Sequence, residues 1–124
     1  MESESAGPLL NGKAVLIVED EAIISFMLED MMNELGAMNI AHAATIAEAL
    51  TAIDVRTPQI AILDLNLGGE LSYPVAERLE NLGIPFLFTT GYGRVEARWS
   101  SRGIVQKPFD IAAIEGALRK ALAV

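Results

Sequence analysis

The chain of 124 residues contains no cysteine, one histidine and one tryptophan, and few basic side chains. The absence of cysteine excludes disulfides and thiolate metal sites. Nine Lys and Arg face 17 Asp and Glu, giving a net charge of -8, which does not favour direct contact with nucleic acid. No apolar run approaches membrane-spanning length, and the first residues lack the basic region of a signal peptide. We therefore expect a cytoplasmic protein without membrane insertion.

Hydrophobic residues make up 52% of the chain, which is enough to build the core of one domain. Residues 1–12 are rich in small and polar side chains and are interpreted as a flexible leader. Residues 13–124 are then predicted to form a single folded domain.

Strand-like and helix-like patterns alternate along this domain. The strands are expected at residues 13–18, 38–43, 60–64, 84–89 and 103–106. The helices are expected at residues 21–35, 46–53, 74–82, 94–100 and 111–122. The fourth helix has weak helical character, and its polar composition predicts an exposed, mobile segment. Strict alternation predicts an α/β protein with a doubly wound, five-stranded parallel sheet, flavodoxin-like with strand order 2-1-3-4-5.

Acidic side chains follow two of the predicted strands. Glu19 and Asp20 end the first strand, and Asp64 ends the third. In the flavodoxin-like order these two strands flank the point where ligands bind. Three carboxylates that meet there cannot all stay ionised without a cation, and oxygen ligands suit Mg²⁺. The pattern therefore indicates a metal ion beside Asp64.

The fourth and fifth strands end in Thr90 and Lys107, which suit phosphoryl transfer onto a carboxylate. Asp64 would be the nucleophile, and Lys107 would bind a phosphoryl oxygen. Taken singly, such residues are as often turn residues, helix-dipole partners or solvated side chains. Their common position at one edge of the sheet favours the functional interpretation.

Three other side chains receive a structural interpretation. His42, in the predicted second strand, is expected to be a surface or part-buried residue. Tyr92 and Trp99 are interpreted as surface aromatics or as a partner-binding face.

Residues 13–124 resemble the response-regulator receiver domain, the phosphoacceptor module of two-component signalling. The resemblance rests on Val18-Glu19-Asp20-Glu21, Leu63-Asp64-Leu65-Asn66, Thr90 and Lys107-Pro108-Phe109.

The resemblance implies a role for each matching position. Asp64 would be the phosphorylated aspartate, while Glu19, Asp20, Asp64 and the backbone carbonyl of Asn66 would hold Mg²⁺. Thr90 would be the switch hydroxyl, Lys107 would contact the phosphoryl group, and the Lys107–Pro108 bond is often cis in such domains. The chain would catalyse its own phosphorylation and dephosphorylation and would not otherwise be an enzyme.

The resemblance also implies partners. The donor would be a sensor histidine kinase or a phosphotransfer protein, and the chain would signal by protein contact or act as a phosphate sink. Residues 85–93 resemble a Phe-Ala-Thr-Gly-Tyr subfamily of single-domain regulators, whose kinases are often of the HWE type. Thr89 replaces the usual alanine, and Ile104 replaces a common aromatic. We hypothesise that Thr90 senses the phosphate and that the signal leaves through residues 92–100.

Two alternative functions make different demands on these residues. An aspartate-nucleophile phosphatase of the haloacid-dehalogenase kind needs a second acid two residues after the nucleophile, where this chain has Asn66. A flavodoxin-like nucleotide or flavin binder needs a glycine-rich loop after the first strand. The chain places Glu19, Asp20 and Glu21 there, and their charge would repel a phosphate that lacks a metal.

Overall fold

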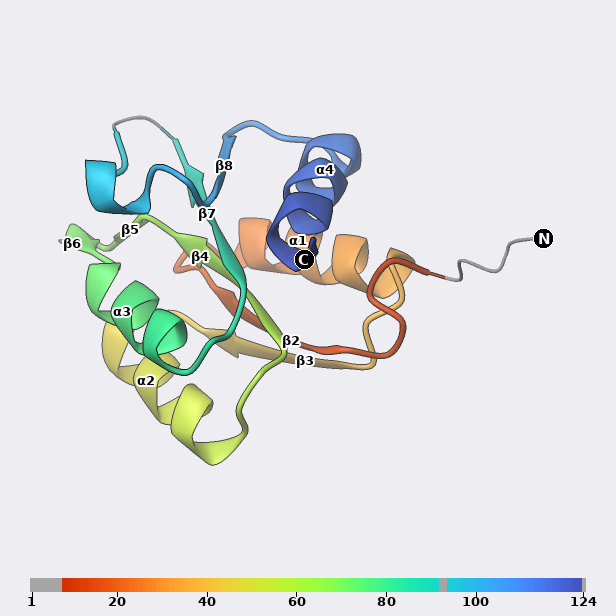
Figure 1. The fold of residues 1–124 in the computed structure, drawn as a ribbon, viewed down its shortest axis with the longest axis horizontal. Helices are drawn as coiled ribbons and strands as arrows, with labels where there is room; N and C mark the ends of the chain where they lie inside the picture. Colours follow the sequence, from red (N-terminus) through yellow and green to blue (C-terminus); the bar gives the residue numbers. More distant parts are fainter. Residues whose placement is uncertain (1–7, 92–93, 124) are drawn as a thin grey trace.

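A five-stranded parallel sheet forms the centre of the protein in the computed structural model, which describes residues 8–91 and 94–123 (Figure 1). Its order is β3-β2-β4-β7-β8. The strands are β2 (Ala14–Val18), β3 (Asn39–Ala43), β4 (Ile60–Asp64), β7 (Phe86–Thr90) and β8 (Gly103–Gln106). Counted along the chain, these strands lie in the order 2-1-3-4-5, which confirms the predicted flavodoxin-like sheet.

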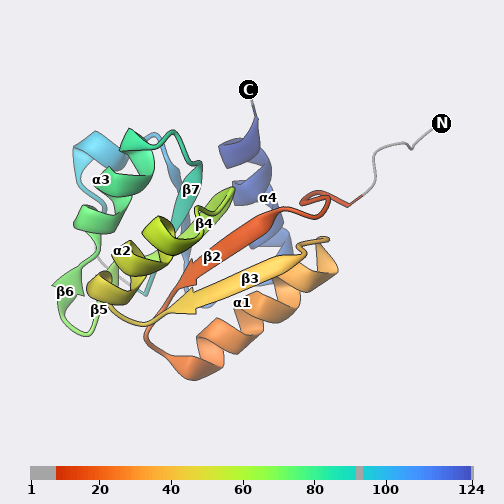
Figure 2. The same ribbon diagram turned by 90° about the horizontal axis from the view of Figure 1, so that it is seen from below.

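Helices cover both faces of this sheet (Figures 1 and 2). They are α1 (Ala22–Glu34), α2 (Ile46–Val55), α3 (Tyr73–Asn81) and α4 (Ile111–Leu122). One face is covered by α2 and α3, and the other by α1 and α4. No helix in the described ranges is long and apolar enough to cross a membrane.

Two of the helix starts follow directly from the sequence. Thr45 accepts a hydrogen bond from the Glu48 backbone N–H, and the Glu48 carboxylate accepts one from the Ala44 N–H. The bond to Thr45 satisfies a backbone donor that the first helical turn leaves unpaired, and the Glu48 carboxylate ties the helix to the residue before its cap. Asp110 caps α4 in the same sense by accepting from the Ala113 N–H. Both predicted starts are confirmed.

The predicted fourth helix is wrong. Within residues 94–100 the chain forms only a short 3-10 turn, η1 (Ala97–Trp99). A small antiparallel pair that was not predicted, β5 (Asn66–Leu67) and β6 (Glu70–Leu71), precedes α3. The described part of the chain therefore holds four α-helices beside the five-stranded sheet.

Trp99 also differs from its predicted surface position. Its side chain is 1% exposed and packs in the core beneath α3. Tyr73 stacks on it with the ring centroids 6.2 Å apart, and Phe86 and Phe88 of β7 meet it edge-on at 5.9 and 6.3 Å. We call these four residues the aromatic cluster. Tyr92 lies outside the described residues.

Polar residues around Trp99 are paired with α3. The polar composition of this segment therefore predicted exposure for a residue that is buried. Arg98 donates to Glu77 and to Glu80, both at 2.9 Å, and Arg102 donates to Glu80 at 3.3 Å. The Glu96 backbone N–H donates to the Tyr73 hydroxyl at 2.8 Å. The segment is polar on its outer side because it is ion-paired to a helix, while its single large apolar side chain is buried.

Packing begins before the predicted domain start at residue 13. Leu10 is fully buried, and its N–H donates to the Leu35 carbonyl at 2.9 Å. The Gly12 N–H donates to the Gly36 carbonyl at 2.8 Å. Gly36 has a φ of 101°, and a β-carbon there would lie 2.4 Å from Pro8. Glycine is therefore required where α1 ends and residues 8–12 cross it.

Candidate functional site

The carboxyl ends of the strands bring the predicted site residues together. Glu19 follows β2, Asp64 ends β4, Thr90 ends β7 and Lys107 follows β8. A surface cavity at this edge is lined by Asp20, Glu21, Asp64, Asn66, Gly68, Gly69, Thr90, Gly91 and Lys107. The cavity lies at the switch point of the sheet, where open α/β folds bind their ligands.

Three acidic side chains meet beside this cavity. Glu19, Asp20 and Asp64 each have a carboxylate oxygen within 4.8 Å of the others. Glu19 and Asp64 are buried, whereas Asp20 is exposed. Oxygen donors at this spacing suit a hard divalent cation, and one exposed ligand leaves room for the waters that Mg²⁺ retains. The residues therefore fit the predicted metal.

Lys107 joins two of these acids. Its ammonium donates to Glu19 Oε1 at 3.0 Å and to Asp64 Oδ2 at 3.2 Å, and it lies 3.8 Å from Glu21 Oε1. Burial opposes the charge of the ammonium, but the hydrogen bond to Glu19 and the negative charge of Asp64 outweigh burial and raise the pKa of Lys107. Lys107 therefore stays charged and offsets part of the acidic charge.

The surroundings of Glu19 disfavour its ionised form. Burial raises the pKa of the Glu19 carboxyl to about 7, and the charge of Asp64 adds to this effect. The hydrogen bonds from the Glu21 N–H and from Lys107 act in the opposite direction. Without a cation, Glu19 is thus partly protonated near neutral pH, and a bound cation would favour its ionised form.

The loop after Asp64 is held by its own hydrogen bonds. The Asn66 N–H donates to Asp64 Oδ1 at 3.3 Å, and the Asn66 side chain accepts from the Gly69 N–H at 2.7 Å. Ser72 is fully buried and donates to the Asp64 carbonyl at 2.6 Å. Sequence reasoning missed Ser72, because only the fold brings it back to the end of β4.

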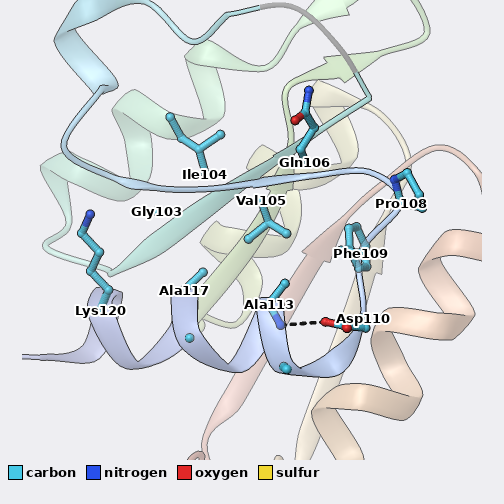
Figure 3. Close-up of a pocket in the computed structure, with 12 residues that line it drawn as sticks. Gly103, Ile104, Val105, Gln106, Pro108, Phe109, Asp110, Ala113, Ala117 and Lys120 are labelled. Atoms are coloured by element: carbon cyan, nitrogen blue, oxygen red, sulfur yellow. Dashed lines mark hydrogen bonds between the residues drawn. The ribbon is translucent and has the colours of Figure 1, made fainter.

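Thr90 lies at the acidic edge of the sheet, where the sequence predicts it, and Ile104 lies outside the site. Thr90 lines the cavity, and its carbonyl accepts from the Lys107 N–H at 2.8 Å. Ile104 is 44% exposed and points away from α4, opposite to Val105 (Figure 3). It borders a separate groove between β8 and α4, so its side chain does not contribute to the acidic site. The Lys107–Pro108 bond is cis, as the resemblance implied.

His42 is a surface residue of β3 and lies outside the site. Its Nδ1 is 2.6 Å from Ser25 Oγ, and its Nε2 is 2.8 Å from Glu29 Oε1, so its ring braces β3 against α1. The structural interpretation of His42 is confirmed.

Comparison with known proteins shows the family of this chain. Residues 15–119 match the response regulator receiver domain. The chain belongs to the response regulator receiver family. Receiver domains are phosphoacceptors in two-component signalling, are generally non-enzymatic, and typically bind Mg²⁺ at an acidic pocket. Their partners are histidine kinases or phosphotransfer proteins.

The similar solved structures include isolated receivers. The solution structure of SdrG from Sphingomonas melonis Fr1 is 41% identical, with a TM-score of 0.82, and the match covers 90% of this chain and 97% of SdrG. The receiver domain of PhyR from Erythrobacter litoralis is 30% identical, with a TM-score of 0.77 and coverage of 95% and 92%.

A curated relative is longer than this receiver. The probable transcriptional regulator ycf27 of Cyanophora paradoxa is 29% identical over 119 residues, which cover 91% of this chain and 49% of ycf27. The chain thus spans about half the length of the curated relatives that it matches.

Proposed function

We propose that Asp64 accepts the phosphoryl group in a two-component phosphorelay. The observation that carries this proposal is the bridge that Lys107 makes between Asp64 and Glu19 at the edge of a cavity. A buried carboxylate that a lysine holds in place, beside two further acids, is a nucleophile with a cation site next to it. Asp64 Oδ2 already faces an ammonium that could bind a transferring phosphoryl group.

The chemistry follows from these positions. An Asp64 carboxylate oxygen attacks phosphorus, the bond from phosphorus to the donor's imidazole nitrogen breaks, and the imidazole keeps that electron pair. Lys107 moves from Asp64 Oδ2 to a phosphoryl oxygen, and the Thr90 hydroxyl donates a hydrogen bond to a second phosphoryl oxygen. Glu19, Asp20, Asp64 and the Asn66 carbonyl would hold Mg²⁺, which would supply positive charge that offsets the phosphoryl oxygens.

The donor in this proposal is a sensor histidine kinase, including the HWE type, or a phosphotransfer protein. Support for the HWE type comes from the Phe-Ala-Thr-Gly-Tyr-like segment. The output is contact with a further protein or removal of phosphate from a competing receiver. The phosphatase alternative remains disfavoured because Asn66, two residues after Asp64, cannot exchange a proton.

Phosphorylation by a small donor tests the proposal. The protein is incubated with acetyl phosphate and Mg²⁺, and intact-mass spectrometry is expected to show the addition of one phosphoryl group. Asp64→Asn removes this addition, whereas Asp30→Asn, an exposed aspartate of α1 outside the site, keeps it. Unchanged labelling of the Asp64→Asn protein would remove Asp64 from its role. Repeated turnover of unrelated phosphoesters would instead support a phosphatase.

A panel of histidine kinases then tests the partner. Transfer from an HWE kinase that is faster than transfer from kinases of other types is expected. Equal or slower transfer from the HWE kinase would contradict that part of the proposal.

A further inference from the structure

Thr89 has a buried hydroxyl without a visible partner. The residue is 1% exposed, and its Oγ1 makes no hydrogen bond to any residue that the structure describes. A buried hydroxyl without a partner is destabilising, because it has given up its hydrogen bonds to water. Other buried side-chain polar atoms in the described ranges find partners. An unpaired hydroxyl at this position therefore calls for a role in another state of the protein.

The strand register places Thr89 beside the acidic site. It pairs with Asp64 of β4 on one side and with Val105 of β8 on the other. Leu87, two residues earlier, packs in the core on the α1 and α4 face of the sheet, as do Ile62 and Val105. Because side chains alternate along a strand, Thr89 and Asp64 point to this same face.

Lys107 reaches Asp64 across this position. It lies two residues after Val105, on the far side of β7 from Asp64. Neighbouring strands are about 4.8 Å apart, so the lysine side chain must cross the end of β7 to reach Oδ2 of Asp64. Thr89 is thus the β7 side chain on this face between Lys107 and Asp64. Thr90 has the opposite alternation, with Phe88, and lines the cavity.

We propose that Thr89 is a positioning residue whose hydroxyl donates to the Asp64 carboxyl group once Lys107 has moved to the phosphoryl group. This inference rests on the proposed function of Asp64. In the unphosphorylated protein, Lys107 supplies the hydrogen bond to Asp64 Oδ2. When Oδ1 of Asp64 carries the phosphoryl group, the ammonium is drawn to that group, and the remaining acyl oxygen, Oδ2, loses its donor. The Thr89 hydroxyl replaces that donor and gains the partner that it lacks before phosphorylation.

The role predicts opposite effects of one substitution on the two states. Thr89→Val keeps the side-chain shape but removes the hydroxyl, so the unliganded protein is expected to unfold at a higher temperature. The same variant is expected to bind Mg²⁺ with beryllofluoride, an acyl-phosphate mimic, about fivefold more weakly than the unchanged protein, the equivalent of one neutral hydrogen bond. Thr89→Ser retains the hydroxyl and is expected to bind within about twofold of the unchanged protein.

Calorimetric titration with Mg²⁺ and beryllofluoride and thermal unfolding of these three proteins test the role of Thr89. Asp64→Asn is the control for specific binding. Equal beryllofluoride affinity in the valine variant and the unchanged protein would overturn the role of Thr89. The same loss in both the valine and serine variants would also overturn it, because packing would then explain the effect. A lower unfolding temperature of the unliganded valine variant would show a hydroxyl that is already satisfied. Failure of the unchanged protein itself to bind beryllofluoride or to be phosphorylated would instead reject the proposed function.

Discussion

The two sides of β7 stabilise the protein in different ways. On one side, Phe86 and Phe88 join Tyr73 and Trp99 in the aromatic cluster, where the rings contact one another from several directions. On the other side, Thr89 adjoins a charged group in which one ammonium serves two buried carboxylates. Ring contacts tolerate small movements, whereas a buried charge without its partner is costly. The aromatic side is therefore suited to stability and the charged side to a change of state.

The largest expected effect comes from removing the indole on the aromatic side. Trp99→Ala opens a cavity among Tyr73, Phe86 and Phe88, and should lower the free energy of unfolding by about 4 kcal/mol. Urea denaturation measures this loss, and Trp99→Phe should lose less. Mg²⁺ affinity of the folded Trp99→Ala protein should stay unchanged. A loss below about 1 kcal/mol would contradict the structural role of Trp99.

Removing the ammonium group of Lys107 tests the charged side of β7. Lys107→Met leaves Glu19 and Asp64 buried without their shared donor, and should lower the free energy of unfolding by about 3 kcal/mol near pH 8. The loss should be smaller at acidic pH, where Glu19 can take up a proton, and Mg²⁺ should recover part of it. Urea denaturation at two pH values, with and without Mg²⁺, measures the effect. Equal losses at both pH values would show that repulsion between the acids is not its cause.

The charged side should also make the stability of the metal-free protein depend on pH through Glu19. The folded-state pKa of Glu19, about 7, lies above the ordinary value of 4.5, so the folded state binds more protons between these two values. The stability from this group is present below about pH 4.5 and is lost as the pH rises through about 7. The change should be on the order of 3 kcal/mol.

Unfolding in EDTA across this pH range measures the Glu19 contribution. Glu19→Gln cannot titrate and should flatten the profile, whereas Trp99→Phe should lower the profile and leave its slope unchanged. An identical slope in the Glu19→Gln protein would assign the titration to another group.

The smallest effect should come from the exposed arginine over the aromatic cluster. Arg98 lies 4.4 Å above the Trp99 ring and pairs with Glu77 and Glu80. Arg98→Ala should lower the unfolding temperature by much less than Trp99→Ala, because exposed ion pairs contribute little. Arg119→Ala, which removes an exposed pair with Glu115 of α4, is the matched control without an aromatic neighbour. An Arg98 effect no larger than the Arg119 effect would assign no stability to the stacked guanidinium.

The charged side could be predicted from the sequence because each of its residues stands at the end of an apolar strand. Parallel strands end at one edge, so Glu19, Asp64 and Lys107 had to meet once the strand order was fixed. The fold itself followed from the same alternation of strands and helices. Helix caps such as Thr45 and Asp110 depend on neighbours within four residues, so they could also be predicted from the sequence.

The aromatic cluster could not be predicted because its contacts depend on tertiary packing. Trp99 stands among polar residues, and its partner Tyr73 belongs to a helix that precedes it by two elements. Ser72 was missed for a related reason, because its contact depends on the return of the chain to the end of β4. Thr89 stood out in the sequence only as a replacement of alanine, and its place beside Asp64 depends on strand register. The polar residues around Trp99 indicated solvent exposure. The pairing of Arg98 with Glu77 and Glu80 of α3 explains why the segment is polar although Trp99 is buried.

The position of Trp99 also has an optical consequence. The chain has a single tryptophan, so its indole emission reports on one place alone. That indole packs against Phe88, the residue just before the two threonines at the end of β7. A displacement of β7 that accompanies phosphorylation would change the surroundings of this fluorophore without any attached dye. The protein thus carries a built-in spectroscopic probe, and stopped-flow fluorescence can time its response to a phosphodonor.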